Sequence, residues 1–489
     1  MAATEFAGTE RFELRSRLGA GGMGVVYEAL DRERDVRVAL KTLRAPSAEA
    51  LLRLKREFRA LQGLEHPNLV NLGELIEAAG QWFFTMELID GIDLLTWVRP
   101  GSEIPSLAQT ADSPFGEVAQ GAARSPNAVG GTLDLSRLRQ AIAQLASGLF
   151  ALHRAHKVHR DIKPSNVLVT PAGRVVLLDF GLIAEGFGDG DEGRVTGTPA
   201  YMAPEQSASD RVGPEADWYA MGVVLFEALT GRLPFDGAPL ELLLDKQARP
   251  APDANRFSPS VPEDLAALCA ELLRRDPKER PSGAAILARL GAPLPETRLR
   301  VDSPSQAAPF VGRRRELALL TAAHAEARNH AVALYVEGES GQGKSALVRR
   351  FTEGLASETL VLAGRCYERE SVPYKAIDDL VDGLSRHLSS LSKREAAALL
   401  SPGVSLLAEV FPVLARVGAV AEAPIDLAGR AGLAGGLDPL ELRAQVFAAL
   451  RALLCRLAEG RPLVLVIDDL QWSDADSLWL LGEVMRPPD

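Results

Sequence analysis

Several residues near the start of the chain are of the types that hold the phosphates of a nucleotide. Gly19, Gly21 and Gly24 form a GxGxxG run, and glycine lets backbone amides approach a phosphate group closely. Lys41 ends an apolar segment and can bring a positive charge to phosphate oxygens. Glu57 flanks the apolar positions of the next predicted helix, so its carboxylate is placed to orient that lysine rather than to face water.

A glycine run of this kind also occurs in two structures of another type. GxGxxG is found in dinucleotide-binding folds, but there a helix follows the glycines at once. Here the strand-like segment 25–30, which includes Val26, follows instead. A glycine-rich hairpin turn remains as the second alternative for this run taken alone.

Acidic and amide side chains follow in two later segments. Asp161, Lys163 and Asn166 lie on one short segment, and Asp179 comes directly after the apolar run 175–178. Carboxylate and amide oxygens are ligands for Mg²⁺, and a carboxylate can accept the proton of a hydroxyl group. Phosphoryl transfer needs this combination of positioning and charge neutralisation rather than a covalent nucleophile.

The segments occur in the order GxGxxGxV, VALK, HRDIKPSN, DFG and APE, which resembles the signature of the eukaryotic-type serine/threonine protein kinases of bacteria. The resemblance extends over roughly residues 11–287 and implies ATP and Mg²⁺ as cofactors. The positions that it implies for ATP binding are Gly19, Gly21, Gly24, Val26, Lys41, Glu87, Leu88 and Asp93.

The same resemblance implies the catalytic roles. Asp161 would accept the proton of the substrate hydroxyl, and Asn166 and Asp179 would hold Mg²⁺. Lys163 together with Thr198 is typical of the serine/threonine branch, so the implied substrates are proteins phosphorylated on serine or threonine. A pseudokinase, which keeps the fold and transfers no phosphate, is the remaining alternative. The implied catalytic residues are Asp161, Lys163, Lys41 and Glu57.

Arg160 directly precedes Asp161, and in the resembled family an arginine there often marks control by phosphorylation of the activation loop. Thr196 and Thr198 are the hydroxyl residues between positions 181 and 199. Thr198 is assigned to the substrate-binding role, so Thr196 is the predicted autophosphorylation site. A loop that is ordered without phosphate is the alternative.

The second half of the chain carries another phosphate-binding run, GESGQGKS, between a predicted strand at 331–336 and a predicted helix. Backbone amides and the helix N-terminus can cradle phosphates there, the lysine can reach β- and γ-phosphate oxygens, and the serine can bind Mg²⁺. Downstream, the apolar run 463–467 ends in Asp468, which would lie by Mg²⁺, and Asp469, which could orient an attacking water. The positions of the run concerned are Gly338, Gly343, Lys344 and Ser345.

These two motifs resemble the P-loop ATPases of the AAA-like and STAND signalling classes, from residue 310 to the C-terminus. FVGR at 310–313 and DDLQW at 468–472 strengthen the STAND-like interpretation. Asp469 stands where glutamate is commoner in AAA enzymes, which argues against fast hydrolysis. The resembled fold continues with a strand between those of the two motifs, so we expect a fragment with an imperfect sheet and weak ATPase activity.

Apolar periodicity indicates the elements that must position these residues. Strand-like segments at 12–18, 25–30 and 37–42 precede a helix, and a long helix with one buried face runs through 138–152. We predict an α+β two-lobed protein kinase fold followed by an incomplete α/β P-loop NTPase domain. The resemblance to the kinase family implies that Arg280 pairs with Glu205. The predicted parts are a kinase domain at 11–287, with an N-lobe at about 11–88, a C-lobe at about 89–287 and a flexible insertion at 100–132, then a linker at 288–309 and an ATPase domain at 310–489.

Composition narrows the class of protein. The chain has 489 residues, 47% of them hydrophobic and 24% charged, which is ordinary for globular domains and excludes collagen and wholesale disorder. A net charge of −11 argues against general nucleic-acid binding. Three dispersed cysteines argue against a disulfide framework, and no apolar run approaches the roughly 20 residues of a membrane helix.

The sequence therefore predicts a cytoplasmic serine/threonine protein kinase that uses ATP and Mg²⁺ and acts on proteins. Its C-terminal ATP-binding domain is expected to act as a switch in signal transduction or as an element of self-association. The alternative from another class is a non-catalytic signalling scaffold, in which both sites bind nucleotide only to set conformation.

Overall fold

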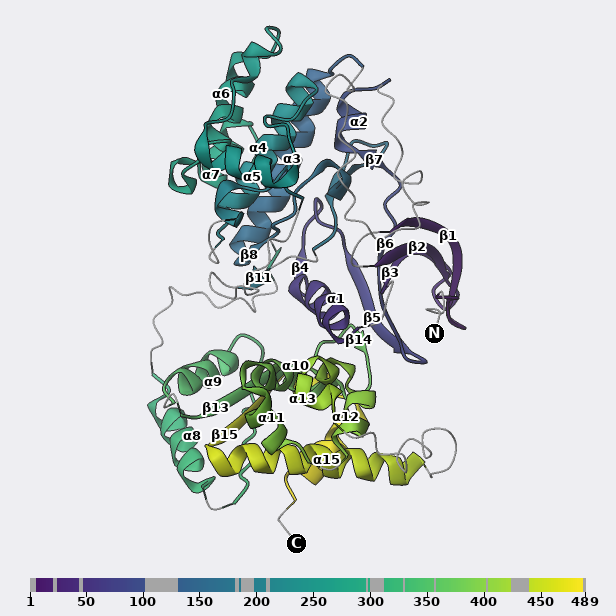
Figure 1. Cartoon of the computed structure of the whole chain (residues 1–489), viewed down its shortest axis with the longest axis vertical. Coiled ribbons are helices and arrows are strands. Elements are labelled where there is room, and N and C mark those ends of the chain that lie inside the picture. The colour runs from purple at the N-terminus through teal and green to yellow at the C-terminus, as the bar shows by residue number, and fades with distance from the viewer. Residues whose placement is uncertain are drawn as a thin grey trace. The chain divides into compact units, whose positions relative to one another are not determined.

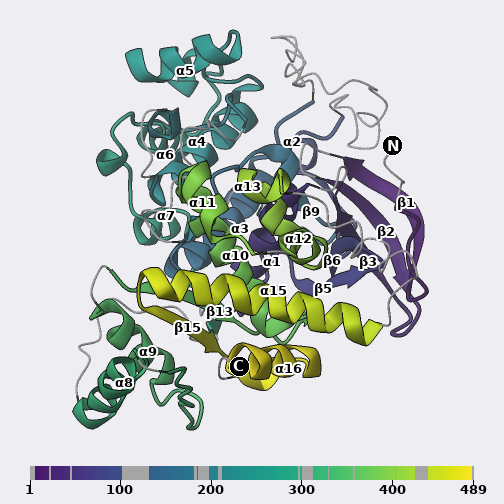
Figure 2. The ribbon, with the colours of Figure 1, turned by 60° about the horizontal axis from the view of Figure 1, so that its bottom comes forward.

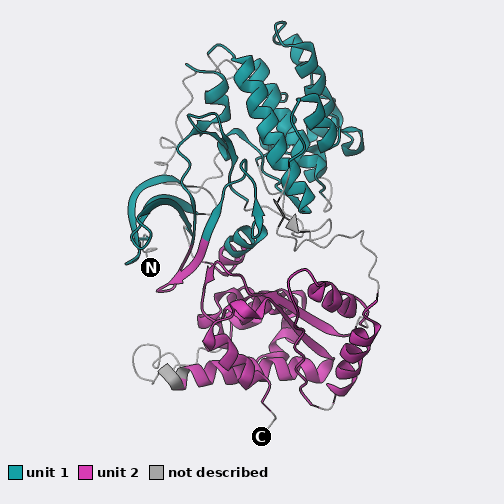
Figure 3. Ribbon diagram, turned by 180° about the vertical axis from the view of Figure 1, so that it is seen from behind, with its two compact units in different colours: residues 1–44, 54–73, 84–303 teal, residues 45–53, 74–83, 304–489 magenta. Residues whose placement is uncertain are grey.

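The computed structural model divides into two compact units (Figure 3). The first unit comprises Met1–Arg44, Leu54–Gly73 and Phe84–Ser303, and the second comprises Ala45–Arg53, Glu74–Phe83 and Pro304–Asp489. Gly21, Thr196 and most of the predicted insertion and linker lie outside the described residues. The structure describes residues 6–20, 24–43, 47–101, 131–180, 184–185, 198–207, 212–295, 298–299, 312–328, 330–355, 358–401, 403–423 and 439–486.

The N-terminal lobe is built on a curved sheet (Figure 1). β1 pairs with β2 and β2 with β3, both antiparallel, and the register places Val26 opposite Lys41. β2 alternates between buried and half-buried residues, which is the period of a strand with one face on a core. The neighbouring strands, in spatial order, are β1 (Phe12–Ala20), β2 (Val25–Asp31), β3 (Val36–Thr42), β6 (Gln81–Glu87) and β5 (Leu72–Ala78).

One helix of this lobe, α1 (Ala48–Ala60), carries a residue of the predicted site. Leu51, Leu54 and Phe58 are buried along one stripe of the helix, with the spacing of successive turns. Glu57 lies beside that stripe and is only 5% exposed. The apolar spacing therefore turns a carboxylate into the interior, as the sequence pattern predicts.

The C-terminal lobe of the first unit is mainly helical (Figure 1). α4 buries almost its whole length and forms the centre of the lobe, whereas α3 buries one face, which includes Leu138 and Ile142. The helices are α2 (Leu94–Val98), α3 (Leu135–Arg154), α4 (Glu215–Thr230), α5 (Pro239–Ala248), α6 (Glu263–Leu272) and α7 (Gly283–Arg289). Short strands of the first unit are β4 (Leu64–Glu65), β7 (Ile92–Asp93), β8 (Lys157–Val158), β9 (Val167–Val169), β10 (Val175–Leu177), β11 (Ala184–Glu185) and β12 (Arg298–Leu299).

The pairing of β9 with β10 positions two segments of the predicted site. The strands are antiparallel, and Val167 at the start of β9 pairs with Leu177 at the end of β10. The residue before β9 and the residue after β10 therefore emerge side by side. These are Asn166, in the short 3₁₀ turn η2 (Pro164–Asn166), and Leu178, which precedes Asp179.

The C-terminal part of the second unit is an α/β arrangement. β13 and β15 form a parallel pair, α10 packs on both strands, and α15 packs on α12 and α16 (Figure 2). The elements are α8 (Arg314–Glu326), α9 (Lys344–Glu353), β13 (Leu360–Arg365), β14 (Glu370–Ser371), α10 (Lys375–Ser390), α11 (Lys393–Leu399), α12 (Val404–Val410), α13 (Gly418–Ala421), α15 (Pro439–Gly460), β15 (Leu463–Asp468) and α16 (Ala475–Val484).

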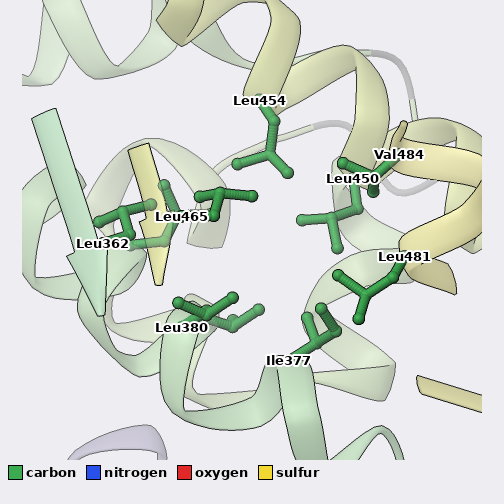
Figure 4. A pocket seen from close by; sticks show the side chains of 10 residues that line it. Leu362, Ile377, Leu380, Leu450, Leu454, Leu465, Leu481 and Val484 are labelled. Atoms are coloured by element: carbon green, nitrogen blue, oxygen red, sulfur yellow. The ribbon is translucent and has the colours of Figure 1, made fainter. Parts of the chain in front are cut away.

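Apolar side chains from both strands and from three helices face one another in a common interior (Figure 4). Parallel strands covered by helices bury continuous apolar runs, and the run 463–467 in β15 is of that kind. Side chains that line this interior are Leu362, Leu465, Leu380, Leu450, Leu454 and Leu481.

The strand predicted at 331–336 is wrong. This segment has no regular secondary structure, and Leu334 and Tyr335 are 52% and 75% exposed. Within the part of the chain that the structure describes, the sheet here consists of β13 and β15, and segment 331–336 pairs with neither strand. A sheet with this gap is the imperfect sheet that the sequence led us to expect. None of the described helices is both long and apolar enough to span a membrane.

Candidate active site

Lys41, near the end of β3, forms ion pairs with two carboxylates from distant parts of the first unit. Its Nζ lies 2.6 Å from Oε1 of Glu57 on α1 and 2.6 Å from Oδ1 of Asp179. The side chains of Lys41 and Glu57 are 8% and 6% exposed, whereas that of Asp179 is 42% exposed. The network thus extends from the buried Lys41–Glu57 pair, between the sheet and α1, to the solvent-accessible carboxylate of Asp179.

The charges of this network follow from burial and pairing. Burial opposes the charge of Lys41, but the two carboxylates outweigh it and hold the pKa of the lysine above its ordinary value. Burial raises the pKa of Glu57, and Lys41 opposes that rise. For Asp179 burial again opposes ionisation, but Lys41 prevails and lowers its pKa. A charged lysine therefore stands beside an ionised, solvent-accessible aspartate.

A buried aspartate of α4 fixes the segment that carries Asp161. The Asp217 carboxylate accepts hydrogen bonds from the backbone N–H groups of His159 and Arg160, both at 2.8 Å. His153 of α3 binds the same carboxylate through Nε2 at 2.7 Å. Burial opposes this negative charge, but His153 and the other partners hold the pKa of Asp217 below its usual range. Arg160 adopts a left-handed backbone with φ of 68°, which these bonds hold in place.

The Asp161 side chain lies within a small polar cluster. Lys163 Nζ donates to Asp161 Oδ2 at 2.7 Å and to Thr198 Oγ1 at 3.1 Å. Thr198 donates both its backbone N–H and its hydroxyl to Asp161 Oδ1, each at 3.2 Å. Asn166 Nδ2 donates to the Asp161 backbone carbonyl at 2.9 Å. A substrate hydroxyl placed here would meet a proton acceptor next to a positive charge.

Backbone and ring contacts join this cluster to Asp179. The N–H of Leu178 donates to the backbone carbonyl of Asn166 at 2.8 Å, and His159 Nε2 lies 3.0 Å from the Leu178 carbonyl. The rings of His159 and Phe180 are 4.9 Å apart between centroids. Asp179, which lies between Leu178 and Phe180 in the chain, has a left-handed φ of 59°. The structure therefore brings all five residues of the predicted phosphoryl-transfer site into one connected set, in which Lys41 and Leu178 make the links.

Asn166 and Asp179 fit a site for Mg²⁺. The Asn166 amide nitrogen is used in the bond to Asp161, so its amide oxygen is the atom that can face a cation. Mg²⁺ is commonly held by one or two carboxylates together with substrate phosphates and water, rather than by a cage of protein ligands. No cluster of three or more His, Cys, Asp or Glu side chains suited to a metal occurs among the described residues.

The predicted ATP-binding glycines differ in what the structure requires of them. A Cβ at Gly24 would lie 2.3 Å from the Thr42 carbonyl oxygen, so a residue with a side chain does not fit beside β3. A Cβ at Gly19 would have no neighbour within 4 Å, so space alone does not demand glycine there. Gly21 lies outside the described residues. Val26, opposite Lys41 on β2, is half-buried.

The side chains predicted to contact adenine and ribose have partners within the protein. Glu87, which ends β6 and precedes Leu88, pairs with Arg174 at 2.9 Å. Any contact of Glu87 with adenine would therefore come from its backbone. Asp93 caps α2 by accepting the backbone N–H of Thr96 at 3.1 Å. The roles of Leu88 and Asp93 in nucleotide binding stay predictions.

Arg280 and Glu205 form the expected ion pair. Arg280 Nη1 and Nη2 bind the two Glu205 carboxylate oxygens at 2.6 and 2.8 Å, and the arginine side chain is fully buried. A bidentate ion pair of this kind fixes the relative orientation of both side chains as well as their distance. It anchors the end of the segment that begins at Thr198.

The phosphate-binding run of the second unit leads directly into α9. Gly343 precedes the helix with a left-handed φ of 81°, and Gly338 has a φ of 155°, both of which favour glycine. Lys344 and Ser345 form the first turn of α9, where backbone N–H groups are available to phosphate. Lys344 Nζ donates to the Gly338 carbonyl at 2.9 Å, so the lysine folds back over its own loop.

The two acids that follow β15 have different partners. Ser345 Oγ donates to Asp468 Oδ2 at 2.7 Å, which brings together the two residues predicted to bind Mg²⁺ at this site. Asp469 is bound by Arg365, the last residue of β13, whose Nε and Nη2 lie 2.7 and 2.6 Å from its Oδ2. Gln471 donates to the other Asp469 oxygen at 2.9 Å. The carboxylate predicted to orient a water is thus held by an arginine.

Sequence reasoning gave no role to three residues that the structure connects to these sites. His159 links the Asp161 segment to Leu178, and it lies inside a recognised motif, which was a usable signal. Lys246 of α5 is buried 4 residues after buried Leu242, so its position on the apolar face was visible in the spacing. Arg365 follows an apolar strand, and no feature of the sequence pairs it with Asp469.

Comparison with known proteins agrees with this geometry. Residues 12–290, more than half of the chain, match the model described as the protein kinase domain, and residues 309–489 match the AAA ATPase domain. These matches confirm the predicted fold class and the resemblance to kinase and AAA families.

The relatives that this chain resembles include three bacterial serine/threonine-protein kinases. The serine/threonine-protein kinase PrkC of Bacillus subtilis is 31% identical over 277 residues, covering 55% of this chain and 38% of the relative. The serine/threonine-protein kinase pkn2 of Myxococcus xanthus is 33% identical over 293 residues, covering 57% and 32%. The DNA damage-responsive serine/threonine-protein kinase RqkA of Deinococcus radiodurans is 34% identical over 290 residues, covering 58% and 39%. The chain thus spans between 32% and 39% of the length of these relatives.

Proposed function

The chain belongs to the protein kinase family, and we propose that it transfers the γ-phosphoryl group of ATP to serine or threonine hydroxyls of proteins. The observation that carries this proposal is the connected set of Lys41, Glu57, Asp161, Asn166 and Asp179. These residues combine a buried ammonium, a solvent-accessible carboxylate and a proton acceptor in one connected set, which is the combination that phosphoryl transfer requires.

Each group has a separate task in this mechanism. Lys41, held by Glu57, neutralises phosphate charge, and Asn166 and Asp179 would hold Mg²⁺, which supplies charge neutralisation at the phosphates when bound. Asp161 orients the acceptor hydroxyl and accepts its proton as the hydroxyl oxygen bonds to the γ-phosphorus, while the bond from that phosphorus to the β-phosphate oxygen breaks and ADP leaves. Most of the rate enhancement then comes from alignment and from preorganised charge.

The cluster of Lys163, Thr198 and Asp161 supports serine and threonine as acceptors. Lys163 donates to both of the other side chains, so its ammonium lies where negative charge develops on the acceptor oxygen. Thr198 fixes the start of the following segment against Asp161. Thr196 remains the proposed autophosphorylation site, and mass spectrometry that finds it unmodified in fully active enzyme would remove it.

For the C-terminal half we propose a nucleotide-dependent switch of the STAND type that regulates the kinase or is regulated by it, with self-association as one readout. The contact of Ser345 with Asp468 supports nucleotide binding. The binding of Asp469 by Arg365 supports slow hydrolysis, because both oxygens of that carboxylate are engaged by side chains rather than directed at water. A cytoplasmic location stays a prediction.

The proposed activity is tested with the full chain, Mg²⁺, radiolabelled ATP and a mixed serine/threonine peptide acceptor. Asp161→Asn should keep ATP binding and lower transfer by roughly 10²- to 10⁴-fold, the usual contribution of a proton-transfer group. Asp236→Asn changes an exposed aspartate of the same lobe in the same way and should leave transfer unchanged.

Lys344→Ala separates the two nucleotide sites. Label that is lost in Asp161→Asn and kept in Lys344→Ala places the transfer at the first site and supports the enzyme. Equal incorporation by Asp161→Asn and the parent chain refutes the assignment. The absence of label in every variant, with nucleotide binding retained, supports the alternative of a non-catalytic scaffold built on a pseudokinase.

A further inference from the structure

Lys246 of α5 is a buried charged residue that the proposed mechanism does not use. Its side chain is 1% exposed, and its three donors are all engaged with backbone carbonyls. Nζ lies 2.7 Å from the carbonyl oxygen of Pro199, 2.7 Å from that of Ala200 and 2.9 Å from that of Met202. The ring of Tyr219 on α4 lies 5.8 Å from the ammonium. The lysine therefore binds the backbone of one short segment, residues 199–202.

That segment follows the residue that contacts the proton acceptor. Thr198 is bonded to Asp161, and the N–H groups of Tyr201 and Met202 both turn back to the Thr198 carbonyl. Further on, Gln206 Nε2 donates to the Arg160 carbonyl at 3.1 Å. The segment 198–206 is thus tied to the Asp161 loop at both of its ends, and Lys246 holds its middle.

The carbonyl groups of this segment need hydrogen-bond donors. Residues 198–202 form a turn in which the carbonyls of Pro199, Ala200 and Met202 all accept from Lys246. Carbonyl dipoles aimed at one point repel one another unless a positive charge lies between them. Leaving them without a donor in a buried place would also cost the full desolvation of each group. The three bonds from Lys246 therefore stabilise the path of residues 199–202.

We propose that Lys246 is a positioning residue for the protein substrate: it fixes the backbone of residues 199–202 and, through Thr198, the alignment of the acceptor hydroxyl with Asp161. The inference rests on the proposed kinase activity. The ATP-binding contacts of Lys41 with Glu57 and Asp179 involve no residue of this segment. Loss of the lysine should therefore affect binding of the acceptor far more than binding of ATP.

Among the described residues, no acidic side chain forms an ion pair with Lys246. Burial lowers the pKa of Lys246 to about 7. The ionisable group that faces it from α4 is Tyr219, whose pKa burial raises, so that ring is neutral at physiological pH. Arg280 stacks over the same ring, 4.9 Å from its centroid. Within the part of the chain that the structure describes, Lys246 therefore acts through backbone carbonyls and not through a salt bridge.

The test measures steady-state kinetics of the full chain with peptide acceptor and ATP varied separately. Lys246→Met keeps the length of the side chain and removes its donors. The expected result is a KM for the acceptor raised about tenfold or more, equivalent to about 1.4 kcal/mol, with the KM for ATP within about twofold of the parent. Lys278→Met makes the same change at an exposed position of this lobe and should alter neither constant.

Other outcomes are decisive as well. Unchanged kinetics in Lys246→Met overturn the inference, and so does a parallel loss of both substrates' binding together with a lower unfolding temperature, which would indicate a purely structural role. If Lys246→Met does not fold, Lys246→Gln, which retains an amide donor, gives the same comparison with a smaller expected shift. A parent chain that binds ATP and phosphorylates no acceptor ends the proposed function, and the inference ends with it.

Discussion

Replacing Glu57 with glutamine tests whether the buried carboxylate acts through Lys41. Glutamine keeps the size of the side chain and an oxygen that can accept the Lys41 hydrogen bond, but it removes the negative charge. The bond is 2.6 Å long, and both side chains are less than 9% exposed, so solvent cannot replace what is lost. Asp179 then becomes the sole carboxylate partner of Lys41 among the described residues.

The size of the effect follows from the kind of bond. The change from carboxylate to amide weakens a buried, charge-assisted hydrogen bond, and bonds of this kind contribute about 1.5–3 kcal/mol. If that contribution is made where Lys41 meets the phosphates, kcat/KM for ATP falls by about 10- to 150-fold. Stability should change little, because burial raises the pKa of Glu57 and so already disfavours its charged form. We expect the free energy of unfolding to shift by less than about 1 kcal/mol.

The assay compares Glu57→Gln, the parent chain and Glu279→Gln, which alters an exposed glutamate of the same unit. Peptide phosphorylation at varied ATP gives kcat/KM, and thermal unfolding gives stability. A Glu57→Gln variant with kcat/KM within about twofold of the parent refutes the reasoning. So does a large loss of stability, because it would show that the carboxylate serves the fold rather than the orientation of Lys41.

Three further changes have directions that the structure fixes. Because burial lowers the pKa of Lys246 to about 7, the folded chain binds fewer protons than the unfolded chain between pH 7 and the ordinary lysine value of 10.5. The contribution of Lys246 to the free energy of unfolding should therefore rise with pH across that window, whereas affinity for the acceptor should fall as the ammonium loses its proton. Thermal unfolding and steady-state kinetics of the parent chain and of Lys246→Met measure the two trends. Gly24→Ala places a Cβ 2.3 Å from the Thr42 carbonyl oxygen, so ATP affinity measured by titration should fall by about tenfold or more, and an unchanged affinity contradicts the close approach. Arg365→Gln releases Asp469, so phosphate release by the second site should rise several-fold, and a fall would mean that the arginine itself assists hydrolysis.

The kinase half was predictable because its site consists of local patterns. The spacing of apolar residues on α1 places Glu57 beside a buried stripe, and the strand that ends in Lys41 is visible as an apolar run. Two short motifs on either side of the β9–β10 pair bring Asn166 and Asp179 together once the strands are aligned. Local propensity and motif order therefore contain most of what determines this site.

The second half was less predictable because its strands depend on neighbours. The run 331–336 has the composition of a buried strand, but a strand forms only where another strand accepts its hydrogen bonds. Sequence periodicity reports the side chains of a segment and not the presence of a partner. The same limit applies to Asp469, since its partner Arg365 lies on another strand and carries no motif.

The limit is sharpest at Lys246. The pairing of Lys41 with Glu57 was predictable because both partners are charged side chains that can be recognised by residue type. The partners of Lys246 are backbone carbonyls, which every residue possesses, so the residue types at 199, 200 and 202 do not predict the contact. The one sign in the sequence is a lysine on the apolar face of α5, 4 residues after Leu242. A lysine at a buried helical position with no acidic partner is therefore expected to bind backbone carbonyls nearby. In this lobe those carbonyls belong to the segment that we propose aligns the acceptor.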